Sequence, residues 1–351
     1  MVYIISFFTL AGYSFSFWMI VGVIRFFYEK LVQQEPKRDI RAQPMTVKDV
    51  AAVIPAHNEA YSIRRTIRAL KRVLPRQNIY VASDYSTDKT VIYARKLGVQ
   101  VADIRPNLGK AKAIVYMLKR YKLIKRYKAV LINDADREID KNYMKLALPL
   151  FQDPKAAVVA PHSNPRWYKY TWWELLFITY RFRLWRVVQY GMRFGQTWKF
   201  TNVSYIVPGS LCLYRTRVLK RLTIDVPGLI IEDFNMTFEV HKKKLGYIAY
   251  DPRIFGWEQD PHNLKDYIRQ IKRWNLGFWQ TVKHNGIWPS MFWFSTGSFI
   301  LELLSYSLFI IFMPGILVYF LLTNFAPLHL PFIYATLTVT DIVIGVFVMD
   351  Y

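Results

Sequence analysis

The sequence predicts an α/β fold built on a mainly parallel, doubly wound sheet, with membrane helices on either side of it. Three observations support this prediction. Strand-like and helix-like segments alternate over residues 49–161, uncharged apolar runs stand at both ends, and the positive charge lies between them. The chain has 351 residues, a net charge of +23 and 53% hydrophobic residues, which is too apolar for a disordered protein. A single cysteine, Cys212, excludes a disulfide framework.

The first apolar run extends from Tyr3 to Ile24 without a charged residue. As a helix it is long enough to cross the roughly 30 Å of hydrocarbon in a bilayer. Basic residues follow this run directly, whereas a cleaved signal peptide carries them before its apolar core. Since positive residues mark the cytoplasmic side, residues 1–28 are predicted as a transmembrane helix with the N-terminus outside, and residues 29–48 as a basic cytoplasmic linker.

Two further apolar runs stand near the other end of the chain. One extends from Phe292 to Leu322 and is interrupted by Pro314 and Gly315, and the other extends from Phe332 to Met349. Residues 290–351 are therefore predicted to form two transmembrane helices, which gives about three in all.

The positive charge could indicate either a nucleic-acid ligand or an anionic membrane surface. All 48 Lys and Arg residues lie between Arg25 and Lys283, so they end where the apolar runs begin. This distribution favours a lipid bilayer as partner, with the middle of the chain in the cytoplasm and no nucleic acid bound. A membrane-anchored nucleic-acid-binding protein remains as a remote alternative.

The middle of the chain begins with alternating elements. Strands are predicted at residues 50–54, 79–82, 99–102 and 129–132, and helices at 59–73, 88–97 and 109–123. Such alternation is typical of βαβ units, whose ligands bind beyond the carboxyl ends of the strands.

Polar residues follow three of these strands. The first strand is followed by Pro55-Ala-His-Asn58-Glu59, the second by Asp84-Tyr-Ser-Thr-Asp88, and the fourth by Asp134-Ala-Asp136. Two aspartates at i and i+2 on a strand end point the same way and can share one hard cation. Each segment alone could be a helix cap or a common loop, but their convergence on one sheet edge indicates a site.

Two later segments also carry chemistry. Gly109 and Lys110 stand at a predicted helix start, and helix N-termini and lysine both favour phosphate oxygens. Glu232 and Asp233 stand at the start of a helix that runs to about Leu245. One of them could accept a proton from a hydroxyl, although an acidic pair in a first turn also simply opposes the helix dipole.

Two helices are predicted at the membrane surface. Residues 167–198 are dense in aromatic residues and arginine, a composition that suits the headgroup boundary. Residues 263–282 form a helix that places Gln270, Arg273 and Trp274 at i, i+3 and i+4, on one face. Arginine can bind a diphosphate, and tryptophan can stack on a sugar ring.

In this order the motifs resemble those of the family 2 glycosyltransferases, and within them the processive membrane synthases of cellulose, chitin and hyaluronan. The resemblance covers about residues 50–280 and ends in Gln-x-x-Arg-Trp, the signature of the processive members. It implies a GT-A-like, Rossmann-type domain over residues 49–262 that includes the interfacial helix at about 167–198. It also implies an interfacial helix over residues 263–289. The family's Thr-Glu-Asp motif is Ile231-Glu232-Asp233 here.

The resemblance also implies a role for each site residue. Asp233, supported by Glu232, is expected as the general base, and Asp136 with Asp134 as the ligands of Mn²⁺ or Mg²⁺. Donor-binding residues are expected at Pro55, Asn58, Glu59, Asp84, Lys110, Asp134 and Arg273. Acceptor-binding residues are expected at Gly209, Ser210, Gln270 and Trp274.

The function implied is an inverting transfer of sugar from a nucleotide-sugar donor, expected to be UDP-linked, to a growing polysaccharide. The alternative within this class is the transfer of one sugar to a lipid or polyprenyl-phosphate acceptor. The partners expected are thus the donor, a glycan or lipid-linked acceptor and the bilayer, and a homo-oligomer remains open.

Overall fold

The computed structural model describes residues 13–32, 44–166, 171–172, 174, 188–259, 261 and 263–305. They belong to two compact units, residues 15–296 and residues 1–14 together with 297–351. In the second unit, the Ser14 backbone amide donates to Glu302 Oε2 at 3.0 Å. The first unit contains the sheet and all of the described residues that are predicted to bind substrate.

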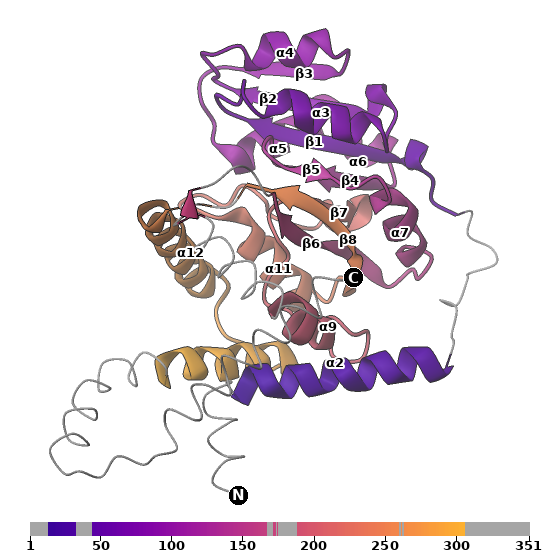
Figure 1. Cartoon of the computed structure of the whole chain (residues 1–351), viewed down its shortest axis with the longest axis vertical. Helices are drawn as coiled ribbons and strands as arrows, with labels where there is room; N and C mark the ends of the chain where they lie inside the picture. Colours follow the sequence, from indigo (N-terminus) through magenta and orange to yellow (C-terminus); the bar gives the residue numbers. More distant parts are fainter. Residues whose placement is uncertain are drawn as a thin grey trace, which may run out of the picture. The chain divides into compact units, whose positions relative to one another are not determined.

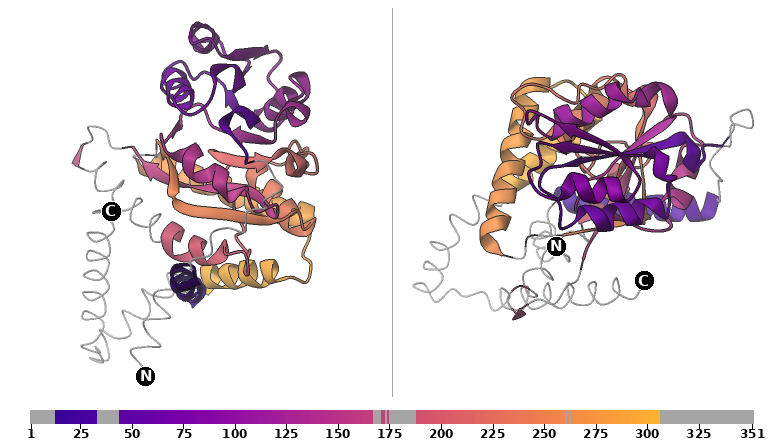
Figure 2. Two further views of the ribbon diagram at one scale, coloured as in Figure 1. Left: turned by 90° about the vertical axis from the view of Figure 1, so that its right-hand side faces the viewer. Right: turned by 90° about the horizontal axis from the view of Figure 1, so that it is seen from above.

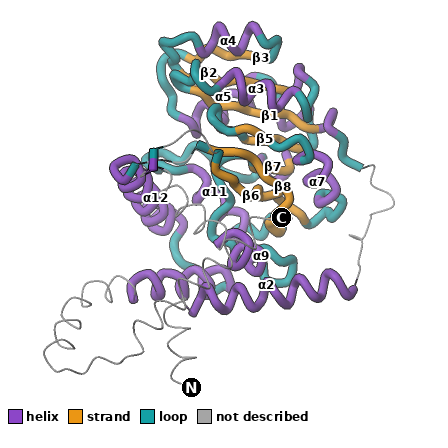
Figure 3. Tube along the Cα trace, in the orientation of Figure 1, coloured by secondary structure: helices purple, strands orange, loops and turns teal. Residues whose placement is uncertain are grey.

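Eight strands form one sheet in the order β3-β2-β1-β4-β7-β6-β8-β5 (Figures 1 and 3). The strands are β1 (Val50–Ala56), β2 (Ile79–Asp84), β3 (Gln100–Ile104), β4 (Ala129–Ile132), β5 (Glu138–Ile139), β6 (Ala156–Pro165), β7 (Cys212–Arg215) and β8 (Tyr247–Glu258). The first four strands pair in parallel, as does β6 with β8. The strand β7 is antiparallel to both β4 and β6, and β5 is antiparallel to β8. The sheet is therefore mainly parallel, as predicted.

Helices cover both faces of the sheet. They are α3 (Ile63–Lys71), α4 (Thr90–Lys96), α5 (Lys110–Arg120), α6 (Leu123–Arg126), α7 (Tyr143–Leu150), α10 (Thr216–Leu219) and α11 (Glu232–Lys242), with the short 3-10 turns η1 (Val47–Asp49) and η2 (Arg76–Asn78). Helices α3, α4 and α7 pack with Val50, Ala52 and Ile54 of β1. Helices α5 and α11 pack with Ala51 and Val53, on the opposite face of the same strand. The alternation along β1 thus divides the core into two layers.

The first helix on the sheet begins later than predicted. The sequence pattern placed its start at Glu59, but α3 begins at Ile63 because residues 58–62 form a turn. Asn58 has a left-handed φ of 56°, and the Glu59 carbonyl accepts bonds from the Ser62 and Ile63 amides. This turn keeps polar groups at the end of β1 instead of winding them into the helix.

The longest helices lie away from the faces of the sheet. The helix α12 (Leu264–Asn285) stands beside one end of the strands (Figures 1 and 2). The helix α2 (Tyr13–Val32) packs along η3 (Val188–Arg193) and α9 (Phe194–Gln196). A Cβ added at Gly195 would clash with the Trp18 carbonyl oxygen, so the two backbones touch there. Residues 291–305 are also helical.

Within the part of the chain that the structure describes, no helix combines the length and the hydropathy needed to cross a membrane. The predicted span from Phe332 to Met349 lies outside the described residues. The spans predicted over Tyr3–Ile24 and Phe292–Leu322 lie partly outside them, as does the interfacial helix predicted at residues 167–198.

Candidate active site at the carboxyl ends of the strands

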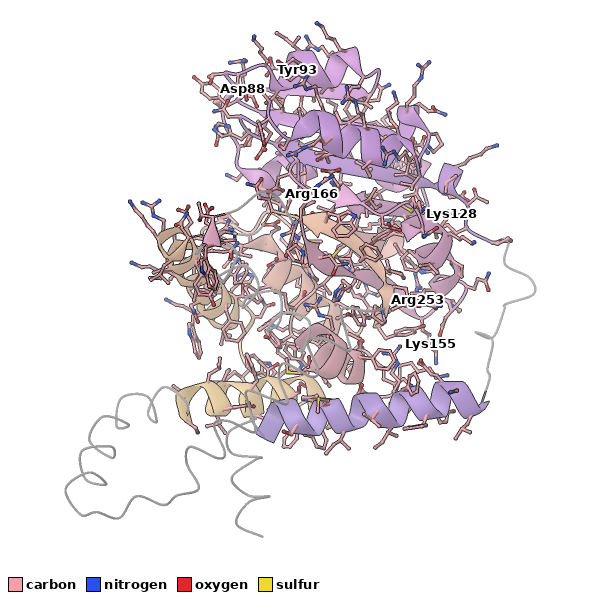
Figure 4. The ribbon with its side chains drawn as sticks, in the orientation of Figure 1. Asp88, Tyr93, Lys128, Lys155, Arg166 and Arg253 are labelled. Carbon is pink, nitrogen blue, oxygen red and sulfur yellow. The ribbon has the colours of Figure 1, made fainter. Side chains whose placement is uncertain are left out.

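The turns that follow β1 and β2 are joined by hydrogen bonds. Asn58 Oδ1 accepts a bond from the Thr87 amide at 2.8 Å, and the Asn58 amide donates to Ser86 Oγ at 3.1 Å. Asp88 Oδ2 accepts from the Ala60 amide at 2.9 Å, and Pro55 is buried in the last part of β1. The two turns, both of which carry predicted donor-binding residues, are therefore held together by hydrogen bonds. Asp88, which Figure 4 labels, fixes the turn.

Asp84, at the end of β2, connects this structure to the start of α5. Its side chain is buried, and its two carboxylate oxygens accept backbone bonds from Leu108 at 2.8 Å and Gly109 at 2.7 Å. Gly109 has a φ of 82° and is the residue before Lys110, the first residue of α5. Asp84 thus positions the lysine, and its own expected role in binding the donor remains a prediction.

Lys110 lies between carboxylates from two distant parts of the chain. Its Nζ is 2.8 Å from Asp134 Oδ1 and 2.9 Å from Glu232 Oε1, and it donates to the Gly209 carbonyl oxygen at 3.2 Å. Burial alone lowers the pKa of Lys110, but the two carboxylates outweigh burial and hold the pKa above its usual value. The ammonium group therefore joins the Asp-x-Asp segment to the start of α11.

Asp233 stands one residue into α11 and has a perturbed acidity. Burial and the neighbouring Glu232 carboxylate raise the pKa of Asp233 to about 7, against the lowering effect of Lys110. Its Oδ1 is buried and has no hydrogen-bond partner among the described residues. A titratable group with this pKa and an unpaired oxygen fits a general base that works near neutral pH.

The Gly209-Ser210 segment lies against this carboxylate. A Cβ at Gly209 would lie 2.9 Å from Asp233 Oδ2, so a larger residue would displace the carboxylate or the loop. Ser210 Oγ accepts a bond from the Asp134 amide at 2.8 Å. The predicted acceptor loop, the predicted base and the first aspartate of Asp-x-Asp thus lie together.

The second aspartate faces a different part of the site. Asp136 is exposed and lines a cavity of about 460 Å³ together with Gln259, Asp266, Arg269, Gln270 and Arg273. Partial desolvation raises the pKa of Asp136, as does the nearby Asp134, whereas Arg137 lowers it. The structure therefore places Gln270 and Arg273 beside Asp136, as expected for one site. Trp274 is half-buried and is not among the lining residues.

The acidity of Glu59 is also affected by the neighbouring aspartates. Burial raises its pKa, and the charges of Asp136, Asp134 and Asp88 raise it further. Its Oε2 accepts a hydrogen bond from the Ser62 hydroxyl. The three polar segments that follow β1, β2 and β4 therefore converge at one sheet edge.

The donor atoms fit a divalent cation that is shared with a ligand. Among the described residues, no group of three or more His, Cys, Asp or Glu side chains could hold a metal alone. Mg²⁺ is usually bound by one or two carboxylates together with substrate phosphates and water. The pair Asp134 and Asp136, with Asp136 open to the cavity, meets that requirement.

Two residues that the sequence reasoning missed support Asp134. Arg137 Nε lies 3.7 Å from Asp134 Oδ2, and its Nη1 makes an ion pair with Glu258 at the end of β8. The position of Arg137 directly after Asp-x-Asp was the available signal. Its partner could not be inferred, because Glu258 follows much later in the chain.

Comparisons with known proteins show which proteins the chain resembles. Residues 48–277 match the family model described as Glycosyltransferase like family 2. A probable glycosyltransferase of Bacillus subtilis is 27% identical over 239 residues, which are 65% of this chain and 54% of that protein. A poly-beta-1,6-N-acetyl-D-glucosamine synthase of Staphylococcus epidermidis is 24% identical over 285 residues, 76% of this chain and 66% of that protein. The chain thus spans about half to two thirds of the length of these relatives.

A solved structure shares the architecture. A mannosyltransferase from Pyrobaculum calidifontis, in complex with GDP-Man and Mn2+, aligns with a TM-score of 0.54 at 14% identity, over 93% of this chain and 94% of that one. At this identity the likeness concerns the fold, and it confirms the predicted GT-A-like α/β architecture.

Proposed function

Since the chain belongs to the glycosyltransferase-like family 2, we propose that it is a metal-dependent, inverting sugar transferase that extends a polysaccharide from a UDP-linked donor. The observation that carries this proposal is the environment of Asp233. Its carboxylate has a pKa of about 7 and an unpaired buried oxygen, and it touches the Gly209 segment beside Lys110 and Asp134. The proposed base Asp233, the ammonium group of Lys110 and the carboxylate of Asp134 thus lie within one cluster.

The chemistry follows from these positions. Asp233 accepts the proton of an acceptor hydroxyl as that oxygen forms a bond to the anomeric carbon of the donor sugar. On the opposite side of this carbon, the bond to the diphosphate oxygen breaks, and the diphosphate leaves with the electron pair. Attack from the face opposite the leaving group inverts the configuration. Lys110 and Arg273 place positive charge where the leaving group gains negative charge.

Asp136 and Asp134 would hold Mn²⁺ or Mg²⁺, as the position of Asp136 at the cavity allows. The cation supplies charge neutralisation for the diphosphate when it is bound. Lys110 keeps one oxygen of Asp134 occupied at 2.8 Å, so Asp136 is the more accessible of the two ligands.

We place this activity at a membrane surface, with the catalytic domain in the cytoplasm and the N-terminus outside. The outward face of α12 supports this placement, because it combines exposed apolar residues with exposed lysines. They are Leu264, Ile268, Leu276 and Trp279, and Lys265, Lys272 and Lys283. Apolar side chains with lysine among them suit the boundary of an anionic bilayer.

A panel of nucleotide sugars tests the reaction. The purified full chain in detergent is incubated with UDP- and GDP-linked sugars and with glycan and polyprenyl-phosphate acceptors, with and without Mn²⁺, and both the release of the free nucleoside diphosphate and the length of the product are measured. We expect release from at least one UDP-sugar only when Mn²⁺ is present. Release from none of the donors would refute a transferase. A product that stops at one added sugar would refute chain extension and leave single transfer to a lipid acceptor.

A further inference from the structure

The cavity beside Asp136 is lined by two arginines, and only one of them belongs to the Gln-x-x-Arg-Trp signature. Arg269 and Arg273 both line it, and they stand four residues apart on α12, on neighbouring turns of one side. Arg273 belongs to the signature, whereas Arg269 lies outside it. Two arginines therefore line the same cavity as Asp136.

Arg269 is only weakly held in the free protein. Its Nη1 lies 3.4 Å from Asp266 Oδ1, and both side chains are exposed, by 68% and 51% respectively. An ion pair so open to solvent contributes little. Arg273 forms no ion pair with any residue that the structure describes. Both arginines can therefore turn toward an anion in the cavity at small cost.

Asp266 is held in place by hydrogen bonds with Asn263 at the start of α12. Its amide donates to Asn263 Oδ1 at 2.9 Å, and its Oδ2 accepts from Asn263 Nδ2 at 2.8 Å. Asn263 is the N-cap of α12, so this pair fixes the start of the helix. Asp266 is thus held by the helix cap and binds Arg269 only weakly. An anion with more charge would bind Arg269 more strongly than Asp266 does.

We propose that Arg269 is a second diphosphate-binding residue, which acts together with Arg273 and makes the site prefer a nucleoside diphosphate over a monophosphate. This proposal rests on the proposed function, which supplies the nucleotide donor. Arginine binds phosphate oxygens through parallel N–H bonds, and a diphosphate offers enough oxygens for two arginines and a cation. A monophosphate offers fewer oxygens and less charge, and one arginine can satisfy it.

Titration calorimetry with UDP and with UMP, in the presence of Mn²⁺, tests the proposal on the full chain in detergent. The variants are Arg269→Gln and Arg269→Lys. The control is Arg253→Gln, at an arginine that is likewise exposed, by 74%, and that loses an ion pair with Asp251 at 2.7 Å. Figure 4 labels Arg253 on the side of the sheet away from α12. We expect Arg269→Gln to weaken UDP binding about tenfold and to leave UMP binding unchanged, since one charge-assisted contact is lost. Arg269→Lys should recover only part of the affinity, and Arg253→Gln should match the unmodified chain.

Each other result has a definite meaning. Equal UDP affinity in Arg269→Gln and the unmodified chain would overturn the role of Arg269 while leaving the transferase intact. An equal loss for UDP and UMP would also overturn it, because the effect would then not concern the second phosphate. If the unmodified chain does not bind UDP, the proposed function fails, and the role of Arg269 fails with it.

Discussion

Asp233 is the side chain whose protonation controls the proposed chemistry. With a pKa of about 7, the carboxylate is mostly protonated at pH 6 and mostly ionised at pH 8. Since only the ionised form accepts a proton, we expect kcat/KM to fall about tenfold for each pH unit below 7 and to level off above 8. Initial rates of nucleoside diphosphate release over pH 5–9 measure this profile. A flat profile across pH 7 would exclude Asp233 as the base.

Replacement of the same residue should separate catalysis from donor binding. Asp233→Asn keeps the shape of the side chain but cannot accept the proton, so we expect at least a 100-fold loss of kcat with little change in UDP affinity. A parallel loss of UDP binding would instead place Asp233 on the donor.

The stability of Asp233→Asn should change with pH in a direction set by the raised pKa. Between about pH 4 and pH 7, the folded chain retains a proton that the unfolded chain has lost, so Asp233 lowers the stability of the fold as pH rises. Asn carries no charge, so the variant should gain up to about 4 kcal/mol over the unmodified chain at pH 8 and little at pH 4, because each pH unit by which the pKa is raised corresponds to about 1.4 kcal/mol. Denaturant unfolding at both pH values measures the difference.

Lys110 should contribute to stability as well as to the site. Lys110→Met removes the cation that Asp134 and the nearly buried Glu232 share. Because the lysine is 35% exposed and partly screened, we expect a loss of about 1–2 kcal/mol, below that for a fully buried pair. Adding Glu232→Gln should restore part of this loss. Lys128→Met, which removes an exposed ion pair with Asp49 at 3.2 Å, is the matched control and should cost less than about 0.5 kcal/mol. Figure 4 labels Lys128.

Among the secondary-structure elements, α12 is fixed against α11 by an unusually close contact. A Cβ at Gly277 would lie within 2.9 Å of three side-chain atoms of Ile231, the residue before Glu232. Ile231 is buried, and its branched side chain has few rotamers. Asn285 Nδ2 also donates to Asn235 Oδ1 at 2.8 Å, which joins the same two helices further along. The position of Arg273 therefore depends on a contact next to the predicted base.

A double-mutant cycle should reveal this dependence. We expect Gly277→Ala to destabilise the fold by about 1 kcal/mol despite the better helix propensity of alanine, because Ile231 must move. In an Ile231→Ala background the same substitution should be neutral or stabilising, since the space is then free. Denaturant unfolding of the four variants gives the coupling energy. Additive effects would show that the two helices are not in contact there.

The sequence was most informative where the elements alternate. The segments from β1 to β4 follow a regular βαβ pattern, and polar residues after parallel strands meet at one edge by geometry alone. The other half of the sheet, in which β5, β6, β7 and β8 pair in mixed directions, was not predicted. The strand β8 carries Asp251 and Arg253 in its middle, and β7 has only four residues, so neither shows a clear strand pattern. The ion pairs of Lys110 and Arg137 also escaped prediction, because their partners lie far away in the sequence.

At the scale of the whole molecule, the net charge of +23 matters through the positions of the lysines. Lys265, Lys272 and Lys283 share the outward face of α12 with exposed apolar side chains. The opposite side of this helix packs on α11 through Gly277, Thr281 and Asn285, all of which are buried. A helix that is anchored on one side and basic and apolar on the other would hold the active site close to an anionic surface.

Binding to vesicles tests this arrangement. We expect the triple replacement of Lys265, Lys272 and Lys283 by Glu to reduce association with phosphatidylglycerol-containing vesicles by at least about tenfold, since each lysine near such a surface contributes about 1 kcal/mol. The control replaces Lys96, Lys119 and Lys125, which are exposed on α4, α5 and α6, and changes the net charge equally. Co-sedimentation in low and high salt measures both variants against the unmodified full chain. If both triple variants lose binding equally, total charge controls association and the face of α12 has no special role. If only the α12 variant does, this helix orients the catalytic domain on the membrane, with the cavity at Asp136 held beside the lipid surface.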